Sequence, residues 1–422
     1  MPTKYDGVLI ENNVIERVDR SAMKLVSSAW SNQSTKNNPG LPINWYPSTN
    51  VVVRNNRIDK AGGDAITVRD TDGALVEYNK VSDSRYQNTG YNAGIWPFQA
   101  TNTVIQYNEV YRTRGVQDGQ GLDNDHVSTN TVMQYNYSHD NEGGFMLVMN
   151  GFPHVSPTIR YNISQNDKDK TIEFARGTPA GVVFYNNTLY SASKLAGRAG
   201  IIDMPNTKAG TGNRHAFFFN NIFYYPQNES FFVERSDAKQ QMDKFHFYNN
   251  AYWGVTPPVQ EKQAITGIAA LSGIDAIPEE TGSLSPRAGQ YLSSELAAYK
   301  LNSEDSKLIN SGVSLQDAIE HFYNELKIVN RQPISEEQRL SLSPTELFEL
   351  ASRRTSVDAI AQTYPAIATV TYGTDFFGTA LPSSNLSLGA SQYLDRSAKE
   401  GNSNPVPDKR VASVEEMNGR NE

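Results

Sequence analysis

A strand-like alternation of apolar and polar residues recurs nine times in the first 250 residues, and each copy carries an Asn at the same position. The copies are VLIENNVI at 8–15, VVVRNNRI at 51–58, ALVEYNKV at 74–81, TVIQYNEV at 103–110, TVMQYNYS at 131–138, TIRYNI at 158–163, VVFYNNTL at 182–189, FFFNNIF at 217–223 and FHFYNNAY at 245–252. The aligned residues are Asn13, Asn56, Asn79, Asn108, Asn136, Asn162, Asn187, Asn221 and Asn250, and most steps between them are 23 to 29 residues. Period-two alternation of β-branched and aromatic residues predicts a strand in each copy.

A repeat of this length indicates stacked supersecondary units. The units are too short to hold the crossover helix of a βαβ unit, and the segments between them are rich in turn-forming Gly, Asn, Asp, Ser and Thr. The repeat therefore predicts the windings of a parallel β-helix, whose inward side chains stack into a continuous core. An Asn at a fixed turn tolerates left-handed geometry and can bond the next winding, so the nine asparagines predict an internal hydrogen-bonded ladder.

On these repeats the chain resembles the right-handed parallel β-helix (pectin-lyase-like) superfamily, in its bacterial carbohydrate-active form. The resemblance covers roughly residues 6–255, and SKLINSGV at 306–313 and residues 372–393 are similar to the closing segment of many bacterial secreted β-helix proteins. It implies an all-β fold: a right-handed solenoid with a small α-helical C-terminal insertion. Proteins of this type are commonly polysaccharide hydrolases, lyases, epimerases or depolymerases, so the fold does not fix the activity.

The expected organisation has three parts. Residues 1–255 form the catalytic β-helix, 256–393 a C-terminal region with the helical insertion and the closing segment, and 394–422 a polar tail that is a linker or disordered. Apolar residues at helical spacing predict a helix over 314–329. Because strand residues start almost at once, we expect the first winding to be covered by native residues upstream or by another polypeptide.

The composition of the chain argues against several classes of function. The net charge of −8 argues against nucleic acid as the main partner, and the chain has no 18-residue apolar run that would predict a membrane span. The absence of cysteine excludes thiol catalysis, disulfides and thiolate metal sites. This composition is typical of a secreted or periplasmic bacterial protein.

Candidate chemistry lies on the strand that follows each turn. The relevant segments are DAITVRD at 64–70, AGIWPFQ at 93–99, QGLDNDH at 120–126, GGFMLVM at 143–149 and KTIEFAR at 170–176. If Ile66, Ile95, Leu122, Phe145 and Ile172 point inward, the outward residues are Thr67, Arg69, Trp96, Phe98, Asp123, Asp125, Met146, Val148, Glu173 and Ala175. This places several acidic side chains and an aromatic residue on one outer wall.

Two aspartates on one strand are a candidate acid–base pair. Like charges this close cannot both ionise easily, so one pKa should rise, and two carboxyl groups of different pKa are what glycoside hydrolysis needs. We therefore expect Asp125 to be one catalytic carboxylate and Asp123 or Asp118 the other. Glu173 is a further catalytic candidate, although a salt bridge to Arg176 or Arg69 would explain it equally well.

Other side chains on this wall are candidates for holding a sugar. Trp96 can stack on a sugar ring, and Arg69 and Arg176 can bond hydroxyl or acidic groups. The predicted substrate-binding residues are Trp96, Arg69, His126, His139, Asp140 and Arg176, with both histidines and Asp140 expected in loops beside the carboxylates.

The predicted function is thus hydrolysis of glycosidic bonds in an oligo- or polysaccharide, without a cofactor. One alternative reading of Asp118, Asp123 and Asp125 is a Ca²⁺ site, because oxygen ligands at such spacing suit that ion. A polysaccharide lyase that uses this Ca²⁺ with Arg176 as the base, and a non-catalytic glycan-binding adhesin, are the alternative functions. The acidic cluster in one winding favours the hydrolase, since a purely structural solenoid has no need of it.

Overall fold

The structure is a computed structural model of the 422-residue chain. It describes residues 3–26, 47–87, 90–126, 128, 130–149, 157–175, 182–192, 194–195, 200–205, 215–227, 230–234, 236–269, 271, 296–325, 374–382 and 385–393.

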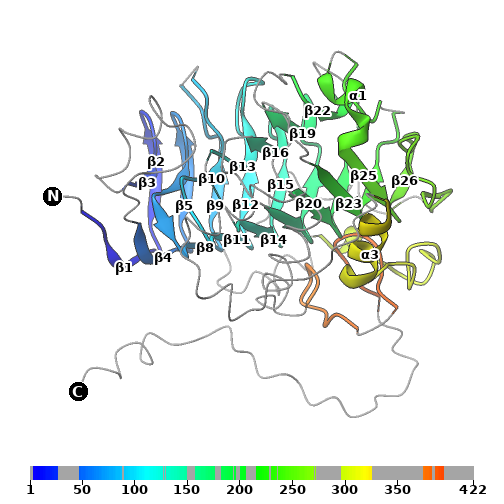
Figure 1. Ribbon diagram of the computed structural model, residues 1–422. Coiled ribbons are helices and arrows are strands. Elements are labelled where there is room, and N and C mark those ends of the chain that lie inside the picture. The colour runs from blue at the N-terminus through cyan, green and yellow to red at the C-terminus, as the bar shows by residue number, and fades with distance from the viewer. Residues whose placement is uncertain are drawn as a thin grey trace, which may run out of the picture.

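Parallel strands of the described residues form three sheets that run the length of an elongated body (Figure 1). Sheet A contains β1 (Asp6–Glu11), β4 (Ser48–Arg54), β7 (Thr71–Asp72), β8 (Leu75–Glu77), β11 (Val104–Gln106), β14 (Val132–Gln134), β17 (Thr158–Arg160), β20 (Val182–Tyr185), β23 (Ala216–Phe219) and β25 (Phe245–Tyr248). Sheet B contains β2 (Val14–Val18), β5 (Arg57–Ala61), β9 (Lys80–Ser82), β12 (Glu109–Tyr111), β15 (Tyr137–His139), β18 (Ile163–Gln165), β21 (Thr188–Tyr190), β24 (Ile222–Tyr224), β26 (Ala251–Trp253) and β27 (Ile265–Thr266). Sheet C contains β3 (Met23–Leu25), β6 (Ile66–Arg69), β10 (Ile95–Phe98), β13 (Gln120–Asn124), β16 (Gly144–Met149), β19 (Lys170–Ala175) and β22 (Gly200–Asp203).

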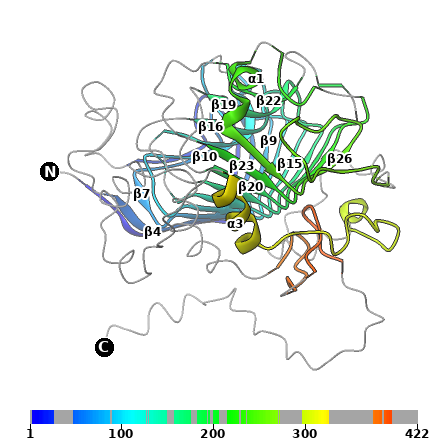
Figure 2. The same ribbon diagram turned by 45° about the vertical axis from the view of Figure 1, so that its right-hand side comes forward.

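Among the described residues, the first seven windings each contribute a strand to all three sheets, and the later ones extend sheets A and B. The predicted parallel β-helix is therefore confirmed. Successive windings lie behind one another when the molecule is turned (Figure 2). Matching apolar residues stack inside: in sheet C the in-register row is Ile66, Ile95, Leu122, Met146, Ile172 and Ile202. These side chains are at most 1% exposed and belong to one continuous core.

The asparagine ladder is also confirmed, at the corner between sheets A and B. In each winding the backbone N–H and the side-chain Nδ2 of the ladder Asn donate to the Oδ1 of the next one, from Asn13 through to Asn250. The last member, Asn250, donates to Glu261. Buried amides therefore satisfy one another along the molecule.

The left-handed backbone expected at the ladder asparagines belongs instead to the residue before each of them. These residues are Asn12, Asn55, Tyr78, Tyr107, Tyr135, Tyr161, Asn186, Asn220 and Asn249, with φ between 50° and 59°. Where the preceding residue is Tyr, the rings stack on one another from winding to winding, with centroids 4.9 to 5.9 Å apart for Tyr78, Tyr107, Tyr135 and Tyr161.

Chain beyond the last winding packs back on the outside of the solenoid. Helix α3 (Leu315–Glu325) confirms part of the helix predicted at 314–329, and its Phe322 ring lies 4.8 Å from that of Phe217. Asn186 donates to the backbone of Ser387 and Gly389, which ties the closing segment to the windings. The other helices among the described residues are α1 (Asp237–Gln240), η1 (Met242–Lys244) and η3 (Ala297–Tyr299).

Parts of the predicted organisation fall outside the described residues. These are most of the helical insertion, the end of its first helix and the polar tail from 394, and the domain boundaries stay predictions. None of the helices in the described part of the chain is long and apolar enough to cross a bilayer.

Candidate functional site

A pocket of about 500 Å³ lies on the outer face of sheet C. It is lined by Tyr91, Asn92, Ala93, Trp96, Gln117, Asp118, Asp123, Asp125, His126, Met149, Glu173, Ala175 and Pro205. Strands β10, β13, β16 and β19, which lie side by side (Figure 1), supply the floor, and the chain ahead of β10 and β13 supplies a rim. The pocket thus brings together residues that are more than 100 positions apart in the chain.

Register explains why the acidic residues meet. Asp123 pairs with Leu147, and Leu147 pairs with Glu173, so Asp123 and Glu173 stand in one row two windings apart. At ~4.8 Å per winding this is ~10 Å along the solenoid axis. Trp96 comes one winding before Asp123, because its neighbour Ile95 pairs with Leu122. The predicted grouping of these residues on one wall is confirmed.

One strand is shifted by a residue from the prediction. Met146 pairs with Leu122 and Ile172 and lies in the core with Val148, although both were expected to point outward. The outward positions are taken by Leu147 and Met149 instead. The reason lies at the start of the strand: its first residue, Gly144, has φ of 121°, a backbone conformation that side-chain-bearing residues rarely adopt, and so the chain enters β16 in a different phase.

Asp123 and Asp125 share an acidic, poorly hydrated environment. Burial, and then the charges of Asp125 and Asp118, raise the pKa of Asp123 well above its usual range. Its Oδ1 is buried and has no hydrogen-bond partner among the described residues. Burial also raises the pKa of Asp125, but the backbone N–H of His126 donates to its Oδ1 at 2.6 Å and opposes the rise. Of the two, Asp125 is the one whose ionised form is supported.

Asp118 approaches the pair from the rim. Burial, followed by repulsion from Glu173 and Asp125, raises its pKa to about 7. The rim is braced by Arg85, which donates to the carbonyl oxygens of Gly90 (3.0 Å) and Arg114 (3.1 Å) and so joins two loops. Asp118 therefore carries a proton that it can release near neutral pH.

Glu173 forms a salt bridge with the buried Lys170. The Nζ of Lys170 lies 2.8 Å from Oε2 of Glu173, and Nε2 of Gln120 donates to the same oxygen at 3.0 Å. Lys170 is fully buried and also pairs with Asp169 at 2.9 Å. The salt bridge considered for Glu173 is thus present, but with Lys170 rather than with Arg69.

Trp96 and His126 line the pocket, and Arg69 does not. The Arg69 guanidinium lies 4.4 Å from the centre of the Phe98 ring and donates to Gln99 at 3.2 Å, next to the wall but outside the pocket lining. Its positive charge favours the ionised form of Asp125 from that position. Arg69 packs against Phe98 beside the pocket, and its expected contact with a substrate stays a prediction.

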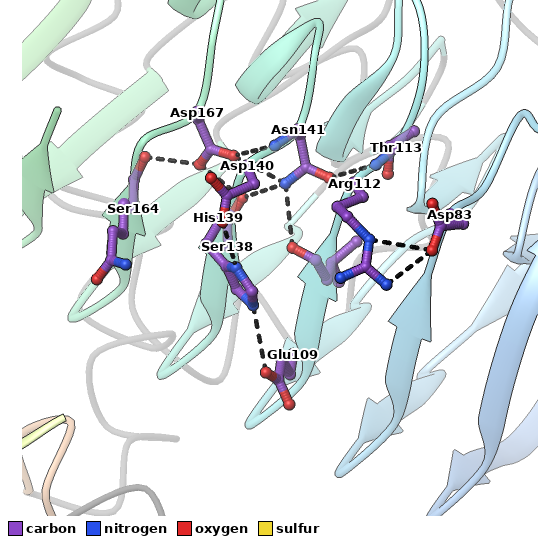
Figure 3. A network of polar contacts seen from close by, with 12 residues as sticks. Asp83, Glu109, Arg112, Thr113, Ser138, His139, Asp140, Asn141, Ser164 and Asp167 are labelled. Atoms are coloured by element: carbon purple, nitrogen blue, oxygen red, sulfur yellow. Dashed lines mark hydrogen bonds and ion pairs between the residues drawn. The ribbon is translucent and has the colours of Figure 1, made fainter. Parts of the chain in front are cut away.

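His139 and Asp140 were expected beside the carboxylates, and this was wrong. His139 belongs to strand β15 of sheet B, is fully buried, and lies between the rings of Tyr111 and Tyr137 (4.6 and 4.3 Å). Its ring nitrogens contact Asp140 and Glu109 in a separate polar network (Figure 3). The chain passes through a strand of sheet B before it reaches sheet C, so these residues lie on another wall of the solenoid. Arg176 lies outside the described residues.

The alternative Ca²⁺ site is not supported by the geometry. In the described part of the chain no three His, Cys, Asp or Glu side chains converge in an arrangement that could hold a metal ion, and this includes Asp118, Asp123 and Asp125.

Several residues that line the pocket were not predicted from the sequence. They are Tyr91, Asn92, Ala93, Gln117, Met149 and Pro205. Most of them lie outside the repeat, and Met149 required the correct phase of β16.

Comparison with known proteins agrees with this architecture. A family profile described as a right-handed beta helix region matches residues 3–157. A lacto-N-biosidase from Bifidobacterium longum subsp. longum is 31% identical in an alignment of 346 residues that covers 75% of this chain and 20% of that protein. The chain therefore spans about a fifth of the length of this relative.

Two solved structures are more distantly similar. A GH136 lacto-N-biosidase from Eubacterium ramulus is 22% identical, with a TM-score of 0.33 over 54% of this chain and 30% of that one. A complex of XylC with xylose is 15% identical, with a TM-score of 0.41 over 64% of this chain and 50% of that one. The strand topology shows that the chain folds as a parallel β-helix, and the profile that matches residues 3–157 describes the right-handed kind.

Proposed function

We propose that this protein is a glycoside hydrolase whose active site is the pocket on sheet C. The observation that carries the proposal is that Asp118, Asp123 and Asp125 line one pocket, where burial and the charges of neighbouring carboxylates raise all three pKa values. Paired carboxyl groups with different protonation are the chemical requirement for cleaving an acetal. Similarity to a lacto-N-biosidase supports the same class of reaction.

The environments assign different roles to the carboxyl groups. Asp125 accepts a backbone hydrogen bond and acts as the ionised group, either attacking the sugar or activating water. Asp118, with a pKa of about 7, is protonated at mildly acidic pH and donates its proton to the leaving oxygen. Asp123 stays neutral between them and is the alternative proton donor.

The name of the relative suggests a first substrate. We propose that the pocket accepts an oligosaccharide that carries a lacto-N-biose unit. The volume of about 500 Å³ falls within the range of ~300–1,000 Å³ for small-molecule sites, and Trp96 offers an aromatic surface to a sugar ring.

The test is product analysis after incubation with such an oligosaccharide. Wild-type protein should release a free disaccharide, and Asp125→Asn and Asp118→Asn should each lose at least ~100-fold in kcat. Asp123→Asn distinguishes the two proton donors, because it should retain more activity than Asp118→Asn. Asp72→Asn, on sheet A, is the matched surface control.

The competing functions give different results. A lyase would produce an unsaturated sugar with new ultraviolet absorbance, and an adhesin would bind the glycan without turnover even when Asp123 and Asp125 are both replaced by Asn. No cleavage of any glycan in a broad library would refute the proposal.

A further inference from the structure

A buried carboxylate behind the pocket is used by none of the steps above. Asp64 lies two residues before the start of β6 and is 2% exposed. Its Oδ1 accepts hydrogen bonds from Nε1 of Trp96 at 3.0 Å and from Nδ2 of Asn92 at 2.9 Å. Its Oδ2 accepts from Oγ of Ser21 at 3.3 Å, one winding back.

Both donors to Oδ1 are pocket residues. Trp96 and Asn92 line the pocket, whereas Asp64 does not. An indole N–H can only donate, so the bond to Asp64 fixes which edge of the Trp96 ring faces the wall and which face is presented to the pocket. Bonds to an ionised acceptor are shorter and stronger than neutral ones, which makes a carboxylate well suited to hold both side chains.

The charge of Asp64 also acts on the aspartates. It opposes ionisation of Asp123 and of Asp125, and thus raises both pKa values. The same residue is therefore placed to influence both the shape of the pocket and its protonation.

We propose that Asp64 is a positioning residue: it orients Trp96 and Asn92 to receive a sugar ring and keeps a fixed negative charge behind the aspartate cluster. This proposal rests on the proposed function for its kinetic consequences, but the orientation of Trp96 is independent of it.

Two substitutions separate geometry from charge. Asp64→Asn keeps an oxygen that can accept both hydrogen bonds but removes the charge. It should leave KM within ~2-fold and move the pH profile of kcat/KM to lower pH, because the aspartates then ionise more easily. Asp64→Ala removes both, so it should show the same pH shift and raise KM ~10-fold, since Trp96 loses its anchor.

A matched control is Asp167→Asn. Asp167 is equally buried and accepts bonds from Ser164, Ser138 and Asn141 (Figure 3). It lies at the same corner between sheets B and C as Asp64 but in a later winding, and it does not line the pocket. This variant should lower thermal stability without changing KM or the pH profile.

A second measurement does not depend on turnover. The chain has four tryptophans, and the indole N–H resonance of Trp96 can be assigned by its loss in Trp96→Phe. It should shift upfield in Asp64→Ala and stay in place in Asp167→Asn. An unchanged resonance in Asp64→Ala would overturn the positioning role even if the wild type cleaves no glycan. Wild-type KM and pH profile in both Asp64 variants would overturn it in an active enzyme.

Discussion

Removal of one asparagine from the middle of the ladder should destabilise the whole solenoid. The Oδ1 of Asn136 accepts from the backbone N and the Nδ2 of Asn108, both at 3.0 Å. Its Nδ2 donates to Asn162 (3.0 Å) and to the carbonyl of Ile105 (2.9 Å). Asn136→Ala leaves the Asn108 N–H and the Ile105 carbonyl without these side-chain partners. At ~1–3 kcal/mol for each buried polar group that is left unsatisfied, the loss is about 2–6 kcal/mol.

The end of the ladder offers an internal comparison. Asn13 is exposed, and its side chain only donates, to Asn56 and to the carbonyl of Glu11. Asn13→Ala should cost ~1 kcal/mol or less, because water replaces its partners. Urea unfolding followed by far-ultraviolet circular dichroism measures both. Equal midpoints for Asn136→Ala and Asn13→Ala would show that the ladder contributes no more than a surface hydrogen bond and refute this reasoning.

Three further predictions concern the site. The pKa of Asp118 is raised from 3.8 to about 7 in the folded state. The protonated carboxyl group therefore stabilises the fold fully below pH 3.8, and this contribution is lost as the pH rises toward 7. The drop in melting temperature between pH 5 and pH 8 should be smaller in Asp118→Asn than in wild type. Lys170→Met leaves two buried carboxylates without their cation and should cost ~3–5 kcal/mol in chemical unfolding, whereas Met at the exposed Lys168 should be nearly neutral. Gly115→Ala and Gly73→Ala both place a side chain at φ near +80°. Only at position 115 would the new Cβ lie 2.0 Å from the guanidinium of Arg85, which joins the two rim loops. Only Gly115→Ala should therefore weaken glycan binding in calorimetry.

Sequence reasoning succeeded where the chain repeats. The ladder residues and the row that joins Asp123 to Glu173 follow from a fixed period, because matching positions of a solenoid stack. It failed where the repeat is interrupted. The phase of β16 depends on Gly144. His139 lies on another wall because it belongs to β15 of sheet B, a strand of only three residues that the sequence pattern does not separate from its neighbours. Tyr91 comes from a stretch with no periodic signal, so only the three-dimensional structure could place it at the pocket.

The ladder has a consequence for how such a solenoid changes over generations. Successive ladder residues are separated by as few as 23 and as many as 43 positions, yet their backbone-to-amide distances stay between 2.9 and 3.1 Å. Windings of different length therefore keep the same spacing along the axis of the solenoid. Residues can be gained or lost between two ladder positions without displacing the row that joins Asp123 to Glu173.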